Sequence, residues 1–198
     1  MNSTPPHTLS WLTRKQARLV QQEFGTPTYV YDQNSLEQQA DRALAFPNAF
    51  GLTVRYAMKA CPSAAVICIL TAKGLHIDAS SGFEARRALR AGVPAEHIQI
   101  TAQQLPSDLA QLHSLGIRLN ACSLNQLRAF AQSFPGGELS VRLNPGLGSG
   151  HSQRTNVGGP SASFGIWHEY LDEVLAIQKA ANLQITGLHS HIGSGSDP

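Results

Sequence analysis

The chain has 198 residues, of which 42% are hydrophobic and 14% charged, and its formal net charge is +2. This composition predicts a packed globular core and argues against disorder. The chain has no lysine- or arginine-rich run and no apolar run near the roughly 20 residues that span a bilayer, so we expect no nucleic-acid partner and no membrane.

The first predicted element is an amphipathic helix over residues 10–25, which contains WLTRKQARLVQQEF. The next segment, Thr26–Asp32, has the sequence TPTYVYD. It is rich in β-branched and aromatic residues, which predicts a strand.

From residue 33 onward, short apolar strands alternate with helices. The predicted strands are Thr53–Lys59, Leu75–Ser80, Ile98–Ala102, Arg118–Ser123, Leu139–Asn144 and Ile185–Gly193. The unit repeats about every 20–25 residues, which is typical of a parallel sheet covered by helices.

Helix boundaries carry their own signals. A serine followed three residues later by Glu or Gln, the capping-box pattern, begins at Ser35, Ser81 and Ser123. In this pattern Glu84 has an ordinary structural explanation as the residue that closes the box. Glycines stand where helix ends need a left-handed residue, at Gly74, Gly92 and Gly116.

Six βα units fit either a doubly wound sheet or a TIM barrel. We favour the barrel because no glycine-rich dinucleotide fingerprint follows the first strand, and because polar residues gather at the carboxyl ends of the strands. A complete barrel has eight units and typically about 250 residues. The sequence therefore predicts an incomplete (β/α)8 barrel of α/β class.

The cysteines are few and odd in number: Cys61, Cys68 and Cys122. This favours free thiols in a reducing compartment, and their spacing does not suit a structural zinc site. The N-terminal sixteen residues lack the basic head and apolar stretch of a secretory signal. We therefore expect a cytoplasmic protein.

Lys59 closes an otherwise apolar strand, VRYAMKA. A lysine at the carboxyl end of a strand among apolar neighbours is expected to be partly desolvated, which favours the neutral amine that condenses with aldehydes. The alternative is a lysine that only extends to the surface from a strand edge.

The last twelve residues read GLHSHIGSGSDP. His189 and His191 are two apart and share a face of the predicted strand. The GSGS that follows can cradle a phosphate with backbone N–H groups and hydroxyls. Two alternatives stay open, a metal site at the two histidines and a plain Gly/Ser turn.

Together, a strand-end lysine and a later His-x-Gly-Ser-Gly strand end suggest an aldehyde cofactor with a phosphate tail. Pyridoxal 5'-phosphate satisfies both halves of this pattern.

Several motifs resemble those of the fold-type III pyridoxal-phosphate-dependent amino-acid decarboxylases, whose barrel is alanine-racemase-like. YAMKA resembles the cofactor-lysine motif of this family, and HSHIGSG its histidine strand. DASSGFE (residues 78–84) and VRLNPG (residues 141–146) are similar to its intervening segments. Residues 150–167 resemble the connection found in the branch that acts on diaminopimelate.

The resemblance implies a role for each matched residue. Lys59 would bind the cofactor covalently, His191 would stack on the pyridine face, and Gly193 and Ser194 would lie beside the phosphate. Asp78 and Arg142 would belong to the polar network around ring and lysine, although Arg142 could also be a structural strand-end ion pair. Three residues of a Gly-rich segment could lie near substrate or only shape the loop: His151, Arg154 and Asn156.

The resemblance also implies a function. It is the decarboxylation of meso-2,6-diaminopimelate, a small amino-acid substrate, to L-lysine, and the resemblance implies a homodimer in the intact family form. The alternatives are decarboxylation of ornithine, arginine or carboxynorspermidine, a non-catalytic relative that binds pyridoxal phosphate, and a metal hydrolase.

Relatives of this family continue with further barrel strands and a C-terminal β-domain that this sequence lacks. We therefore expect the 198-residue chain alone to be feebly active or inactive. The expected division is residues 1–31 as a helix and strand belonging to the second domain of relatives, and residues 32–198 as the partial cofactor-binding barrel.

Overall fold

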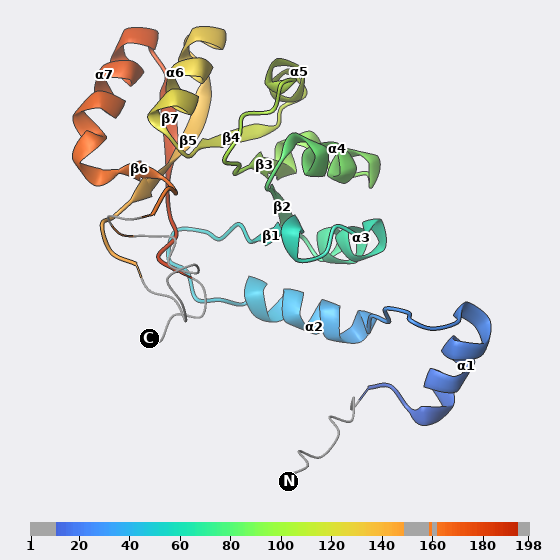
Figure 1. Cartoon of the computed structure of the whole chain (residues 1–198). Helices are drawn as coiled ribbons and strands as arrows, with labels where there is room; N and C mark the ends of the chain where they lie inside the picture. Colours follow the sequence, from blue (N-terminus) through green and yellow to red (C-terminus); the bar gives the residue numbers. More distant parts are fainter. Residues whose placement is uncertain (1–10, 149–158, 160–161, 194–198) are drawn as a thin grey trace.

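The protein is described by a computed structural model, in which residues 11–148, 159 and 162–193 are placed. Figure 1 shows helices α3 to α7 following one another along a sheet, while α1 projects away from it toward the N-terminus. The strands are β1 (Arg55–Ala57), β2 (His76–Ala79), β3 (Ile98–Ile100), β4 (Arg118–Ala121), β5 (Glu138–Asn144), β6 (Ile166–Trp167) and β7 (Gln184–Ser190).

All strand pairs are parallel, as expected for βα units. The strand order is β1-β2-β3-β4-β5-β6, and β7 also pairs with β5. Among the described strands, β1 does not pair with β7, so the sheet is part of a barrel and not a closed one. The α/β class and the incomplete barrel are confirmed.

Helix α2 (Gln33–Leu44) precedes the first strand. The helices between the strands are α3 (Ala64–Ala72), α4 (Gly82–Arg90), α5 (Leu109–Ser114), α6 (Leu124–Ser133) and α7 (Leu171–Ala181). The smaller of two hydrophobic clusters joins α2 to α3, and the larger core lies between helices α3 to α7 and the outer face of the sheet. It contains the alternate strand residues Ile77, Ile98, Ile100, Leu119 and Val141 together with helix residues such as Phe130. Because side chains alternate along a strand, the intervening polar residues face the barrel interior.

The N-terminal segment departs from one prediction. Helix α1 (Arg14–Phe24) forms and begins at a capping box between Thr13 and Gln16. The strand expected over Thr26–Asp32 is absent from the described structure, and Tyr29 is 91% exposed. Strand propensity was misleading here because no neighbouring strand supplies hydrogen bonds or covers these side chains.

The prediction of a serine N-cap is confirmed at two helix starts and wrong at the third. Ser81 and Ser123 cap α4 and α6, where each hydroxyl accepts from the N–H three residues on. Helix α2 begins two residues before Ser35, because the Asp32 carboxylate accepts the Ser35 N–H and is the cap. Gly74, Gly92 and Gly116 have φ of 100°, 86° and 98°, so the left-handed helix ends are confirmed.

The third residue of α6, Gln126, fastens the helix to the neighbouring strand end. It is 5% exposed. Its Oε1 accepts from the Cys122 N–H at 2.7 Å, and its Nε2 donates to the carbonyls of Ala102 and Gln103 at 2.9 and 2.8 Å. Glu84 holds the matching position in α4 but only accepts, from the Ser80 N–H at 2.7 Å.

We predict that Gln126→Glu lowers the free energy of unfolding by about 2–4 kcal/mol, because a buried carboxylate then faces two carbonyls that have lost their donor. Urea denaturation of the variant and the wild type measures this difference. The matched control, Glu84→Gln, keeps its accepted bond and is expected to change stability by less than about 1 kcal/mol. Equal losses in the two variants would contradict the account.

Candidate cofactor site

Polar side chains on or just past six strands meet at the carboxyl ends of the sheet, around a cavity of about 950 Å³. Its lining includes Lys59, Asp78, Thr101, Cys122, Arg142, Phe164, His189 and His191. In an α/β barrel, this end of the strands is where sites are built. Four of the six residues predicted for the site therefore lie around one cavity.

Lys59 lies just past β1, in the 3-10 turn Met58–Ala60. Met58 is fully buried beneath it, whereas Lys59 itself is exposed. The expected desolvation of this lysine is therefore wrong for the described structure. The physical reason is that β1 forms one edge of the sheet, and no described element covers the lysine from the open side.

Asp78 is the third residue of β2 and lies in the interior of the barrel. Its Oδ1 accepts a 2.6 Å hydrogen bond from the Thr101 hydroxyl. Burial raises the pKa of the Asp78 carboxyl, and the bond from Thr101 opposes part of that rise. The site thus holds a carboxyl group that is harder to ionise than that of an exposed aspartate.

Arg142 on β5 is 7% exposed, and its guanidinium lies 5.1 Å from the centre of the Phe164 ring. Among the described residues no carboxylate lies within ion-pair distance, and its Nη2 has no hydrogen-bond partner. The alternative of a structural strand-end ion pair is therefore not seen there. Burial lowers the pKa of Arg142, and the same burial raises the pKa of the Cys122 thiol.

His191 follows β7 and is half-buried at the cavity. Its Nε2 lies 3.0 Å from the Gly193 carbonyl oxygen, which makes that nitrogen the donor. Gly193 is described but does not line the cavity. Ser194 lies outside the described residues, as do His151, Arg154 and Asn156.

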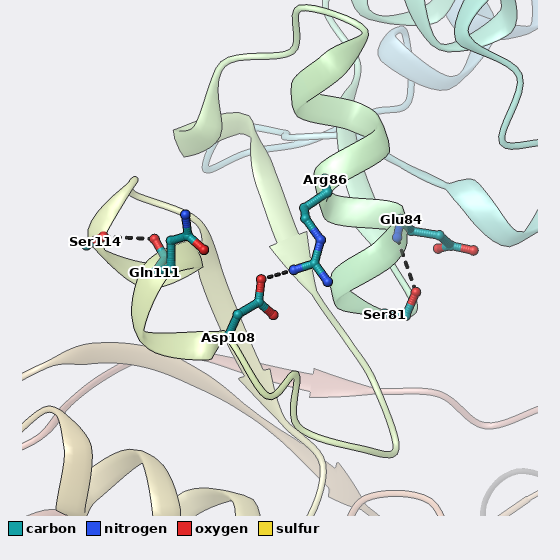
Figure 2. Close-up of polar contacts among 6 residues, drawn as sticks. All are labelled: Ser81, Glu84, Arg86, Asp108, Gln111 and Ser114. Atoms are coloured by element: carbon teal, nitrogen blue, oxygen red, sulfur yellow. Dashed lines mark hydrogen bonds and ion pairs between the residues drawn. The ribbon is translucent and has the colours of Figure 1, made fainter.

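One wall of the cavity is the start of α4 and the loop that leads to α5. Figure 2 shows Arg86 of α4 reaching Asp108, in an ion pair that ties this loop to the helix, and Ser81 capping α4 below it. Gly82 is closely approached by this loop, because a Cβ there would lie 2.9 Å from the Pro106 side chain. The wall is thus fixed by a helix cap, an ion pair and a glycine.

Sequence reasoning missed Thr101, Asn120 and Cys122, and it treated His189 only as a possible metal ligand. Strand alternation could have found them, since Arg118, Asn120 and Cys122 share one face with the strand-end residues. Among the described residues, no group of three or more His, Cys, Asp or Glu side chains is placed to hold a metal.

A partial α/β barrel that gathers a lysine, an aspartate, an arginine and a histidine at its strand ends is the architecture of a barrel enzyme's cofactor-binding domain. The family model described as "Pyridoxal-dependent decarboxylase, pyridoxal binding domain" matches residues 34–198, and the chain belongs to this family. The expected cofactor, pyridoxal phosphate, is confirmed at the level of the family.

Individual relatives give a finer comparison. The chain is 41% identical to the diaminopimelate decarboxylase of Streptomyces coelicolor over 180 residues, which are 88% of this chain and 40% of that protein. A crystal structure of diaminopimelate decarboxylase matches with a TM-score of 0.83 and 34% identity, over 92% of this chain and 44% of the other. The lysine/ornithine decarboxylase of Vibrio vulnificus matches with a TM-score of 0.72 and 27% identity, over 92% and 47%. The chain thus spans less than half the length of these relatives.

No helix among the described residues is long and apolar enough to cross a membrane.

Proposed function

We propose that the protein to which this chain belongs is a carboxy-lyase that converts meso-2,6-diaminopimelate to L-lysine with pyridoxal phosphate. The observation that carries the proposal is that Lys59, Asp78, Arg142 and His191 line a single cavity. The chain is 41% identical to the Streptomyces coelicolor diaminopimelate decarboxylase and 34% identical to one solved structure of this enzyme, against 27% for the lysine/ornithine enzyme. Other solved diaminopimelate decarboxylases are 23–26% identical, so the two higher matches are what favours diaminopimelate as the substrate.

The residues of the cavity suit such a cofactor. Arg142 carries a buried nitrogen without a described partner, which a ligand oxygen would satisfy. Lys59 offers an exposed amine. A cavity of about 950 Å³ exceeds what one amino acid needs and leaves space for a second, larger molecule.

When bound, pyridoxal phosphate supplies an aldehyde that condenses with amines and a conjugated ring that takes up the electron pair left as carbon dioxide departs. Lys59 would hold the cofactor through its Nζ. Arg142 would bind and orient oxygen atoms of the ligand, and His191 would lie against its flat face. Asp78, whose pKa burial raises, would exchange a proton or balance charge near the lysine.

Several finer predictions are proposals of the same kind. The family match begins at residue 34, which supports a boundary after residue 31 between the barrel and an N-terminal segment belonging elsewhere. A homodimer and a cytoplasmic location follow from the resemblance and from the cysteines, and they stay predictions. The roles of Gly193 and Ser194 beside the phosphate also stay predictions.

The substrate assignment can be tested with a chimera, in which residues 1–198 replace the matching part of a longer diaminopimelate decarboxylase. We expect the chimera, supplied with pyridoxal phosphate, to form lysine from meso-diaminopimelate. It should release carbon dioxide from ornithine, arginine or carboxynorspermidine at least about tenfold more slowly in kcat/KM.

The unmodified longer decarboxylase is the control, because it shows the substrate preference that the remaining part of that enzyme supports with its own N-terminal part. Faster turnover of ornithine or arginine by the chimera would assign this chain to another branch of the family. A chimera that binds the cofactor and turns over none of the four would favour a non-catalytic relative.

A further inference from the structure

A chain of hydrogen bonds crosses the inner face of the sheet and connects four strands. It begins at Asp78 beyond the middle of β2, where Thr101 donates to the carboxylate at 2.6 Å. Asn120 on β4 donates from Nδ2 to the Thr101 hydroxyl oxygen at 3.3 Å and lies 2.8 Å from Nδ1 of His189 on β7. Asn120 is fully buried, so its amide has no water to replace these partners.

The orientation of this amide follows from its neighbours. The Ser140 hydroxyl lies 3.0 Å from Asn120 Oδ1 and donates to it. The Thr101 hydroxyl donates its single hydrogen to Asp78, so in its contact with Asn120 the hydroxyl oxygen must be the acceptor. With the oxygen and one N–H of the amide assigned, the second N–H points at His189.

An amide N–H that points at Nδ1 requires an acceptor there. A neutral imidazole has one donor and one acceptor nitrogen, so the hydrogen of His189 must be at Nε2. Among the described residues, His189 has a hydrogen-bond partner only at Nδ1, and its ring lines the cavity. The Nε2–H is therefore available to a ligand.

We propose that Asn120 is a positioning residue that fixes His189 as the neutral Nε2–H tautomer, so that His189 donates a hydrogen bond to an acceptor oxygen of the ligand in the cavity. The oxygen would belong to the cofactor or to the substrate's carboxylate. Only the identity of that ligand depends on the proposed function. The tautomer depends on the hydrogen-bond chain alone.

Burial and the neighbouring basic groups also favour the neutral ring of His189. Arg142 is paired in register with His189, His191 is two residues on, and Cys122 and Asp78 border the same cavity. Burial, followed by Arg142 and His191, lowers the pKa of His189. Below pH 6.5 the imidazole of the unfolded chain takes up a proton that the imidazole of the folded chain resists. The contribution of His189 to the free energy of unfolding is therefore fully present above pH 6.5 and is lost as the pH falls through the lower pKa of the folded state.

The test uses the ¹⁵N-labelled 198-residue chain without cofactor. Two-bond ¹H–¹⁵N correlations from the imidazole carbon-bound protons report which ring nitrogen carries hydrogen, and His189→Gln identifies the His189 signals. We expect the Nε2–H pattern at pH 7.5. An Nδ1–H or cationic pattern in the wild-type chain would overturn the proposal, even if no variant folds.

Asn120→Asp tests the cause, because a carboxylate in this place can accept but cannot donate. The hydrogen of His189 should then move to Nδ1, and the two ¹⁵N shifts should exchange positions. His191 is the internal control, because its Nε2 bonds to Gly193 and makes no contact with Asn120. A folded Asn120→Asp chain with an unchanged His189 pattern would refute the role of Asn120.

Adding pyridoxal phosphate tests the contact with the ligand. We expect the His189 Nε2 and its hydrogen to shift on binding. The donor role would be overturned if absorbance shows that the cofactor is bound while the His189 signals do not shift, either without diaminopimelate or with it. Failure to bind the cofactor at all would count against the proposed function and not against the tautomer.

Discussion

Replacing Lys59 with alanine is expected to abolish covalent capture of pyridoxal phosphate by this chain. Among its four lysines, at positions 15, 59, 73 and 179, only Lys59 borders the cavity. Wild-type chain treated with cofactor and then borohydride should carry one label, at Lys59. Lys59→Ala should carry none, and its lysine-bound absorbance should be lost.

In the chimera, Lys59→Ala should lower turnover by about 10³-fold or more, as expected when the group that forms the covalent bond is removed. Lys179→Ala is the matched control, because Lys179 is exposed on α7 and away from the cavity. Lys73 is a poorer control since it pairs with Asp41 at 2.7 Å. A label on another lysine, or a full label on Lys59→Ala, would remove the catalytic assignment.

Replacing Arg142 with methionine should separate cofactor affinity from stability. The buried Nη2 has no described partner, so it contributes little to folding and is available to a ligand. A hydrogen bond to a charged group is worth about 1.5–3 kcal/mol, which predicts a Kd for pyridoxal phosphate raised by about 10- to 100-fold.

The free energy of unfolding of the cofactor-free chain should stay level or rise in Arg142→Met, because a buried charge without an ion-pair partner costs desolvation energy and methionine can still pack on Phe164. Arg128→Met is the control. Arg128 pairs with Glu173 on the surface, and its loss should cost under about 1 kcal/mol and leave cofactor affinity unchanged. A large loss of stability in Arg142→Met would show that Arg142 is structural.

Much of the fold could be predicted because its signals are local. Short apolar runs located six of the seven strands of the sheet, and serine caps located the starts of α4 and α6. The two-residue strand β6 was missed because two residues are too few to show a periodic pattern, and the strand is defined only by its pairing with the end of β5. The strand expected at Thr26–Asp32 failed for the opposite reason, because a local propensity was present without a neighbouring strand.

The sequence by itself determined that a lysine, an aspartate, an arginine and a histidine would gather at one end of a parallel sheet. Successive βα units place every strand's carboxyl end on the same side, so residues at those ends meet whatever the details of packing. Only the tertiary structure decided that Lys59 is exposed, that Arg142 has no ion-pair partner within the described part of the chain, and that Asn120 links Thr101 to His189. These facts depend on strand register and on hydrogen bonds between residues up to 69 positions apart, which no local pattern encodes.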